Sequence, residues 1–219
     1  PFGAPQFPQA GAFGARGNFV HLGLDMGHRG EQRFALLGCA GDAVLAALQG
    51  DGGVCDVAIV GATGIVGEAL LAILEERGFP VGELYLLASA RSAGGSQEFK
   101  GRHYRIEELG GFDFSRAQIA FFAATSAVSR EHVPRAVAAG CVAIDCSAAF
   151  RYEPDVPLVI PEVNPQAIAG YQDRRIIASP DPATIQMLVA LKPRYDAVGI
   201  ERIEVCIREA VSGRGTAAN

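Results

Sequence analysis

Three glycines, Gly61, Gly64 and Gly67, recur at intervals of three residues directly after a run of apolar residues. The apolar run, residues 57–60, predicts a strand buried on both faces, and leucines at helical spacing after the glycines predict a helix that ends at Gly78. Glycines between a strand and a helix allow a tight turn, a close approach of backbone N–H groups to a pyrophosphate, and close packing of helix on strand. The spacing therefore predicts a dinucleotide site, with a glycine-rich turn that holds no ligand as the alternative.

The second strand of such a unit indicates which dinucleotide is bound. We expect it at residues 84–88, and a NAD site usually has Asp or Glu near its end to hold the ribose 2′-OH. Here the strand is followed by Arg91 and Ser92 and by no carboxylate. A cation and a hydroxyl suit a 2′-phosphate, so the sequence favours NADP over NAD, with a solvated surface loop as the alternative.

The composition excludes several other classes of protein. Of 219 residues, 49% are hydrophobic and 20% are charged, and the formal net charge is −5, so a globular chain without a nucleic-acid partner is expected. No apolar run is long enough for a membrane span. Five cysteines without a C-x-x-C pair predict neither a disulfide framework nor a metal site and are typical of a cytoplasmic protein.

Residues 1–53 are rich in Gly, Ala, Pro and Phe and show no sustained helical or strand period. We expect an irregular, poorly ordered N-terminal extension outside the fold, with a weak helix at residues 35–48 as its one candidate element. The chain begins at Pro1 without a methionine and ends in a run of small residues, so we also expect it to be a fragment.

Residues 54–178 alternate between predicted strands and helices. Further strands are expected at 119–124, 141–145 and 176–178, with a helix at 129–139. This alternation predicts an α/β fold with a doubly wound parallel sheet of the Rossmann type. Residues 179–219, with a helix at 184–191 and a strand at 203–211, are interpreted as the truncated start of an α+β substrate and dimerisation domain.

Several motifs in a fixed order resemble those of the aspartate-semialdehyde dehydrogenases. The resemblance covers roughly residues 55–216, and it includes the segments Gly61–Gly67, Arg91–Gly94, Ser147–Arg151, Val156–Asn164, Thr184–Gln186 and Ala210–Gly213. The resemblance implies an NADP-dependent oxidoreductase that converts aspartyl phosphate to the semialdehyde, on the biosynthetic route to lysine, methionine and threonine. It also implies a homodimer.

The resemblance also implies roles for particular residues. Arg151 matches the arginine that holds the acyl phosphate, and a planar guanidinium suits bidentate phosphate binding. A surface ion pair is the alternative for Arg151. The NADP site would comprise Gly61, Thr63, Gly64, Ile65, Val66, Gly67, Arg91, Ser92, Ser212 and Gly213.

The catalytic cysteine of the family is replaced. The family displaces phosphate with a thiolate from an Asn-Pro-Asn-Cys motif at the start of a helix, and the matching residues here place Asp181 and Pro182 at the Asn and Cys positions. A family glutamine corresponds to Glu209. Proline has no nucleophile, so catalysis by this chain is doubtful, and the added negative charge would oppose an anionic substrate.

No other residue clearly replaces the missing groups. The family also uses a histidine as general base, and none of the histidines here matches it. We expect His132 on a helix surface and the other three in loops: His21, His28 and His103. Cys146, at a family asparagine position, and Cys206, on the last predicted strand, are the candidates for a relocated nucleophile, although most free cysteines are inert small hydrophobes.

Three functions remain open at this point. The first is an NADP-binding member of the family with impaired catalysis. The second is a non-catalytic paralogue that pairs with an active family enzyme. The third is a related acyl-phosphate reductase such as N-acetyl-glutamyl-phosphate reductase, which residues 91–94 and 156–164 argue against.

Overall fold

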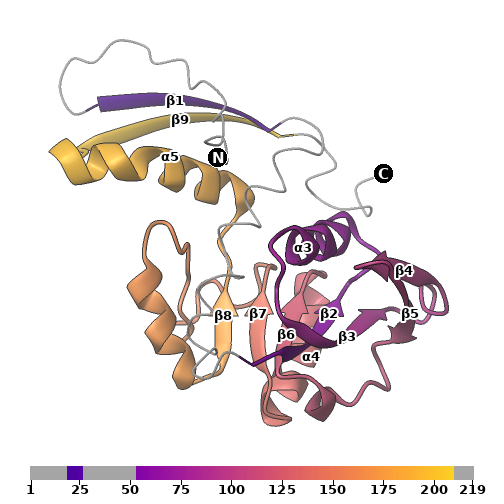
Figure 1. The fold of residues 1–219 in the computed structure, drawn as a ribbon. Coiled ribbons are helices and arrows are strands. Elements are labelled where there is room, and N and C mark those ends of the chain that lie inside the picture. The colour runs from indigo at the N-terminus through magenta and orange to yellow at the C-terminus, as the bar shows by residue number, and fades with distance from the viewer. Residues whose placement is uncertain (1–18, 27–52, 210–219) are drawn as a thin grey trace.

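A computed structural model describes residues 19–26 and 53–209 of the chain (Figure 1). Its main feature is a seven-stranded sheet. The strand order is β4 (Ser96–Phe99), β5 (Arg102–Glu108), β3 (Val81–Ala88), β2 (Cys55–Val60), β6 (Ile119–Phe122), β7 (Val142–Asp145) and β8 (Ile176–Ala178).

All neighbouring strands of this sheet are parallel except β4, which is antiparallel to β5. From β5 to β8 the order is that of two Rossmann halves that diverge from the central pair β2 and β6. The predicted doubly wound sheet is confirmed, with an antiparallel edge strand added.

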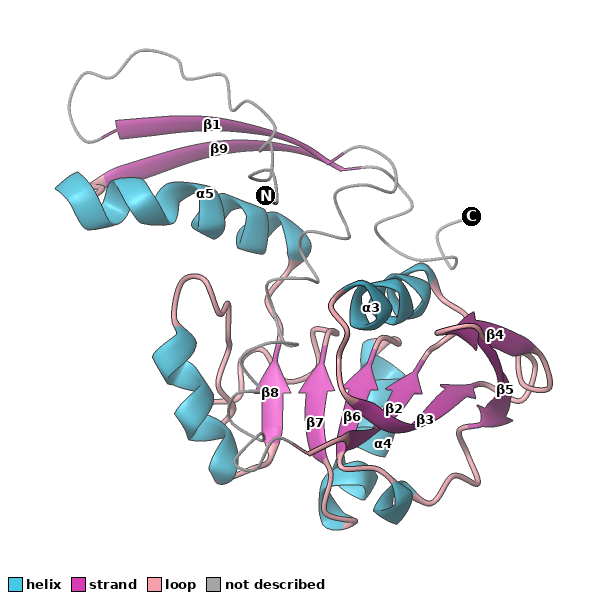
Figure 2. Cartoon of the chain, viewed as in Figure 1, coloured by secondary structure: helices cyan, strands magenta, loops and turns pink. Residues whose placement is uncertain are grey.

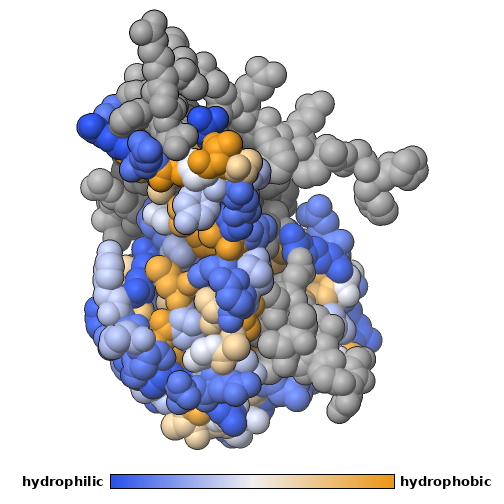
Figure 3. Space-filling view, turned by 90° about the vertical axis from the view of Figure 1, so that its left-hand side faces the viewer, coloured by the Kyte–Doolittle hydropathy of each residue, from blue (hydrophilic) through white to orange (hydrophobic). Residues whose placement is uncertain are grey.

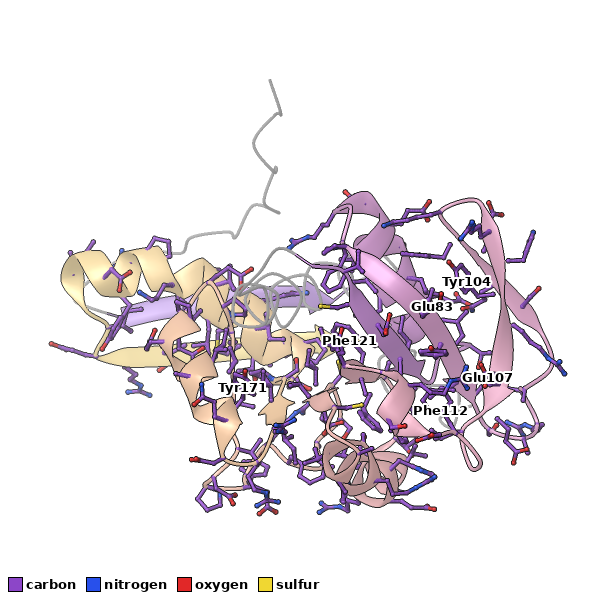
Figure 4. The ribbon with its side chains drawn as sticks, turned by 60° about the horizontal axis from the view of Figure 1, so that its bottom comes forward. Glu83, Tyr104, Glu107, Phe112, Phe121 and Tyr171 are labelled. Atoms are coloured by element: carbon purple, nitrogen blue, oxygen red, sulfur yellow. The ribbon has the colours of Figure 1, made fainter. Side chains whose placement is uncertain are left out.

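Helices cover both faces of the sheet (Figure 2). On one face α3 (Ile65–Glu76) and the 3-10 segment η2 (Pro165–Gln172) pack on Val57, Ile59 and Phe121. On the other face α4 (Ser126–Ala138) and η1 (Phe114–Arg116) pack on Ala58 and Val60. Figure 4 shows Phe121 of the first layer and Phe112 of the second. Residues 57–60 are thus buried on both faces, as predicted.

A second, two-stranded sheet lies beside helix α5 (Pro182–Val198) in Figure 1. It pairs β1 (Phe19–Met26) with β9 (Arg202–Glu209) in parallel. The prediction that residues 1–53 are irregular is therefore wrong for 19–26, while the helix expected at 35–48 falls outside the described residues. The domain division between residues 178 and 179 stays a prediction, although the large sheet ends with β8 at Ala178.

Two elements differ from the predictions for local reasons. Strand β4 was not expected, and it joins β5 through Lys100 and Gly101, whose φ angles of 50° and 72° match a type I′ hairpin turn. Helix α5 continues past the predicted end at residue 191 and through Pro193. The Lys192–Asp196 ion pair spans that proline.

Apolar residues interrupt the polar surface on the side that carries α5 and η2 (Figure 3). A crevice of about 470 Å³ is formed there by Val163, by the C-terminal half of α5 and by the start of β9. None of its lining residues belongs to the glycine turn. Among the described residues, no helix is long and apolar enough to span a bilayer.

His132 is a buried part of α4, so its predicted surface position is wrong, and His103 lies on β5 and His21 on β1 rather than in loops. Arg135 donates to Nδ1 of His132 at 2.7 Å, which leaves the ring proton on Nε2. Burial lowers the pKa of His132, and the charge of Arg135 acts in the same direction while Glu131 opposes it.

The lowered pKa of His132 predicts that acid destabilises the fold. Because the unfolded chain binds a proton below about pH 6.5 while folded His132 stays neutral, this contribution to stability is present above that pH and is lost as the pH falls. The free energy of unfolding in urea, measured between about pH 7.5 and about pH 5.5, should fall less for His132→Gln than for the native chain. The exposed His103→Gln variant is the matched control, and an unchanged slope in His132→Gln would contradict the prediction.

Candidate nucleotide-binding site

The glycine turn lies at the carboxyl end of β2, at the point where the strand order diverges between β2 and β6. Gly61 has φ +85°, and a Cβ there would lie 2.4 Å from the carbonyl oxygen of Ala123 at the end of β6. A Cβ on Gly67 would lie 2.3 Å from the carbonyl oxygen of Gly61. The two glycines therefore allow contacts between backbones that any side chain would prevent.

Helix α3 begins directly after this turn, with Gly64 as its N-cap and no side-chain cap. The first turn of a helix has N–H groups without intrahelical partners, and the helix dipole favours an anion beside them. Thr63 and Ile65 at this end are exposed, so a ligand can reach the backbone. An uncapped helix start on a glycine turn fits a pyrophosphate.

Arg91 and Ser92 lie in a turn after β3, the strand next to β2. The N–H groups of Ser92 and Ala93 both donate to the carbonyl of Ser89, which fixes the turn by its backbone alone. Arg91 is exposed, and no hydrogen bond or ion pair joins it to another residue in the described ranges. Its guanidinium is therefore available to an anion beside the glycine turn.

Arg151 connects the carboxyl ends of β7 and β8. Its Nε donates to the carbonyl of Ser179 at 2.9 Å and its Nη2 to the carbonyl of Cys146 at 3.1 Å. Within residues 53–209, its Nη1 has no partner, which leaves the outer edge of the guanidinium for an oxyanion. The surface ion pair considered as the alternative is absent from the described residues.

A buried carboxylate holds the loop that leads to Arg151. Asp145 is fully buried at the end of β7 and accepts hydrogen bonds from the hydroxyls of Ser129, at 2.7 Å, and Ser147, at 2.8 Å. The N–H of Ser147 also donates to it, and Ser126 Oγ accepts from the N–H of Ala148. The sequence prediction gave a role to Arg151 and included Ser147 only as part of the motif that ends there, although an acid at the end of a buried strand was a usable signal.

Asp181 and Pro182 form a regular helix start. The Asp181 side chain accepts from the N–H of Ala183 at 2.9 Å as the N-cap of α5, and Pro182 follows at the first helical position. Proline suits this position because its missing N–H has no partner there in any case. The two residues therefore stabilise the helix start that they occupy.

The similarity of this chain to known proteins identifies its family. Residues 56–171, more than half of the chain, match the family model described as semialdehyde dehydrogenase, NAD binding domain. The chain belongs to the semialdehyde dehydrogenase family.

Two similar relatives are aspartate-semialdehyde dehydrogenases. The protein from Shewanella violacea is 55% identical over 163 residues, and aspartate-semialdehyde dehydrogenase 2 from Vibrio cholerae is 55% identical over 162 residues. Each match covers 74% of this chain and 48% of the relative, so the chain spans about half of their length.

The fold likeness agrees with the sequence match. The crystal structure of aspartate semialdehyde dehydrogenase II from Vibrio cholerae, complexed with ASA, superimposes with a TM-score of 0.67 at 55% identity. That superposition covers 68% of this chain and 49% of the other.

Other residues of the predicted family site lie elsewhere or outside the described part. Glu209 is the last residue of β9, and its side chain is not described; Ser212 and Gly213 fall outside the described residues. Cys141 is buried, and burial raises the pKa of its thiol to about 11, which makes it inert. Cys146 is half-buried at the end of β7, and its role as a relocated nucleophile stays a prediction.

The glycine contacts predict a specific sensitivity. Gly67→Ala should destabilise the chain by about 3 kcal/mol, because the new Cβ meets the backbone of the turn and neither partner is a flexible side chain. Gly111→Ala is the matched control: nothing lies within 4 Å of its Cβ position, and we expect at most a small gain in stability. Urea unfolding of both variants measures the difference, and equal midpoints would contradict the role of Gly67.

Proposed function

We propose that this chain binds NADP at the carboxyl edge of the large sheet. The supporting observation is the juxtaposition of an uncapped helix start on a glycine turn with Arg91, which has no partner among the described residues. In this proposal Thr63, Gly64, Ile65 and Val66 hold the pyrophosphate, and Arg91 and Ser92 hold the 2′-phosphate. When bound, the reduced cofactor supplies a hydride.

The substrate class that we propose follows from the family and from Arg151. The outer edge of its guanidinium can donate hydrogen bonds to two oxygens of a phosphate or carboxylate, as aspartyl phosphate or the semialdehyde would offer. We propose a role in the amino-acid biosynthetic route of the relatives, in the cytoplasm. In the family, the thiolate that displaces phosphate becomes a thioester. Pro182 has no thiol, so this chain does not form that thioester at this position.

A second candidate function is a non-catalytic partner of an active family enzyme. The well-formed Asp181–Pro182 start of α5 favours it, because the fold is kept while the thiol is lost. Strand β9 also carries an exposed apolar row, Ile203, Val205 and Ile207, which suits contact with a second subunit. Native mass spectrometry of the chain mixed with an intact family enzyme should show a mixed species, and only separate species would refute this function.

The cofactor proposal predicts a selective loss in one variant. The native chain should bind NADPH saturably and more tightly than NADH. Arg91→Ala should weaken the binding of NADPH by about tenfold or more, because a charged hydrogen bond to the 2′-phosphate is lost, and should leave the binding of NADH unchanged. Isothermal titration measures both. Arg130→Ala, an exposed arginine on α4, is the control. Absence of saturable NADPH binding by the native chain would refute the proposal.

The start of α5 gives a test of where the chemistry was lost. A thiol introduced by Pro182→Cys lies at a helix N-terminus, which lowers a thiol pKa, but beside the Asp181 carboxylate, which raises it. Adding Asp181→Asn should therefore shift the iodoacetamide reactivity of this thiol to lower pH, measured peptide by peptide with mass spectrometry.

Pro193→Cys, later in the same helix and exposed, is the matched control. Its alkylation should follow an ordinary thiol. If the Pro182→Cys thiol titrates like the control with and without Asp181→Asn, the start of α5 does not activate a thiol.

A further inference from the structure

Gln97 on β4 contacts the glycine turn from a strand that the sequence did not reveal. Its Nε2 donates to the carbonyl of Ala62 at 3.0 Å across 35 residues of sequence. Its Oε1 is buried and has no hydrogen-bond partner, the one such side-chain atom in the described residues. A buried acceptor without a partner is destabilising, so this side chain is held in an orientation that is unfavourable for its own oxygen.

The Ala62 carbonyl fixes the orientation of that amide. Turned the other way, Oε1 would face the carbonyl oxygen of Ala62, and two acceptors repel each other. Gln97 lies opposite Tyr104 in the β4–β5 pair, and Tyr104 packs on Phe99 and the core beside α3 (Figure 4). The hairpin therefore presents a fixed N–H donor to the back of the turn.

The bond from Gln97 to the carbonyl of Ala62 also affects the N–H of Thr63, which belongs to the same peptide group. All described peptide bonds are trans, so the carbonyl of Ala62 and the N–H of Thr63 point in opposite directions. The remaining groups of the turn are fixed by other bonds: Gly61 and Ala62 donate to Leu87, and Gly64 donates to Gly61. Only the Ala62–Thr63 peptide depends on Gln97 for its orientation.

We propose that Gln97 is a positioning residue for the dinucleotide pyrophosphate. By holding the carbonyl of Ala62 from the β4 side, it directs the N–H of Thr63 away from itself and toward the phosphate-binding side of the turn. This inference rests on the proposed nucleotide binding, and it adds a residue on an edge hairpin to the determinants of that site.

The test separates the pyrophosphate from the rest of the nucleotide. Gln97→Met has a similar shape, removes the donor and also removes the buried Oε1. We expect binding of NADPH, NADH and ADP to weaken by about tenfold, because one N–H contact to a charged oxygen is misdirected. Binding of adenosine 2′-monophosphate, which has no pyrophosphate, should be unchanged. The unfolding midpoint should stay about the same, because the substitution removes one unpaired acceptor, Oε1, and leaves another, the carbonyl of Ala62.

Gln118→Met is the matched control. Gln118 Oε1 accepts from the N–H of Asp56 at 3.1 Å, so the same substitution removes one bond between side chain and backbone. This bond lies at the amino ends of the central strands β2 and β6, whereas the glycine turn lies at the carboxyl end of β2. All four ligands should bind this variant as they bind the native chain.

Each outcome decides between the two proposals. If the native chain binds the pyrophosphate ligands and Gln97→Met binds them equally well, the role of Gln97 is refuted and nucleotide binding stands. If Gln97→Met weakens the binding of adenosine 2′-monophosphate as much as the binding of ADP, Gln97 acts on the adenosine part of the ligand and the inference is also refuted. If the native chain binds none of the ligands, both proposals fall.

Discussion

The structure depends on a contact between backbones at the carboxyl end of β2. Strand β2, the end of β6 and the first turn of α3 meet at Gly61 and Gly67, closer than a Cβ would permit. This contact places the start of a helix at the edge of a sheet whose strands are themselves buried on both faces. The hydrophobic cores on the two faces stabilise the layers, but the glycines decide where the helix start and its unpaired N–H groups lie.

The strand order then gathers the other candidate groups around that point. Arg91 follows β3 on one side of β2, whereas Arg151 connects the ends of β7 and β8 on the other. Two cations flank a helix start on the same edge of the sheet. Such an arrangement suits a ligand or a pair of ligands with separated anionic groups. Among the described residues, the hydrogen-bond partners of the fully buried Asp145 include no cation, and its hydroxyl and amide donors fix the loop between β7 and Arg151.

Sequence patterns predicted those strands and helices that are determined by residues close together in the chain. The apolar runs at β2, β6, β7 and β8 are buried on both faces, so they stand out in the sequence, and the glycine spacing marks the start of α3. The edge strand β4 has one buried residue, Phe99, and no such pattern. Strand β1 exists through its pairing with β9, more than 170 residues later. The bond from Gln97 to Ala62 and the network around Asp145 likewise require the fold before they can be seen, because their partners are distant in sequence.

The predicted replacement of a cysteine by Pro182 at the start of α5 is compatible with an intact fold. A helix N-terminus stabilises a thiolate through its dipole, and the same position accepts proline because no N–H is needed there. A residue at this point can therefore lose its nucleophile without loss of the helix, and Asp181 even supplies a side-chain cap. The proposed nucleotide site lies at the ends of β2 and β3 and does not include Pro182. The proposed cofactor binding and the thiol chemistry of the relatives' fold would thus depend on different elements of the structure, so one can be lost without the other.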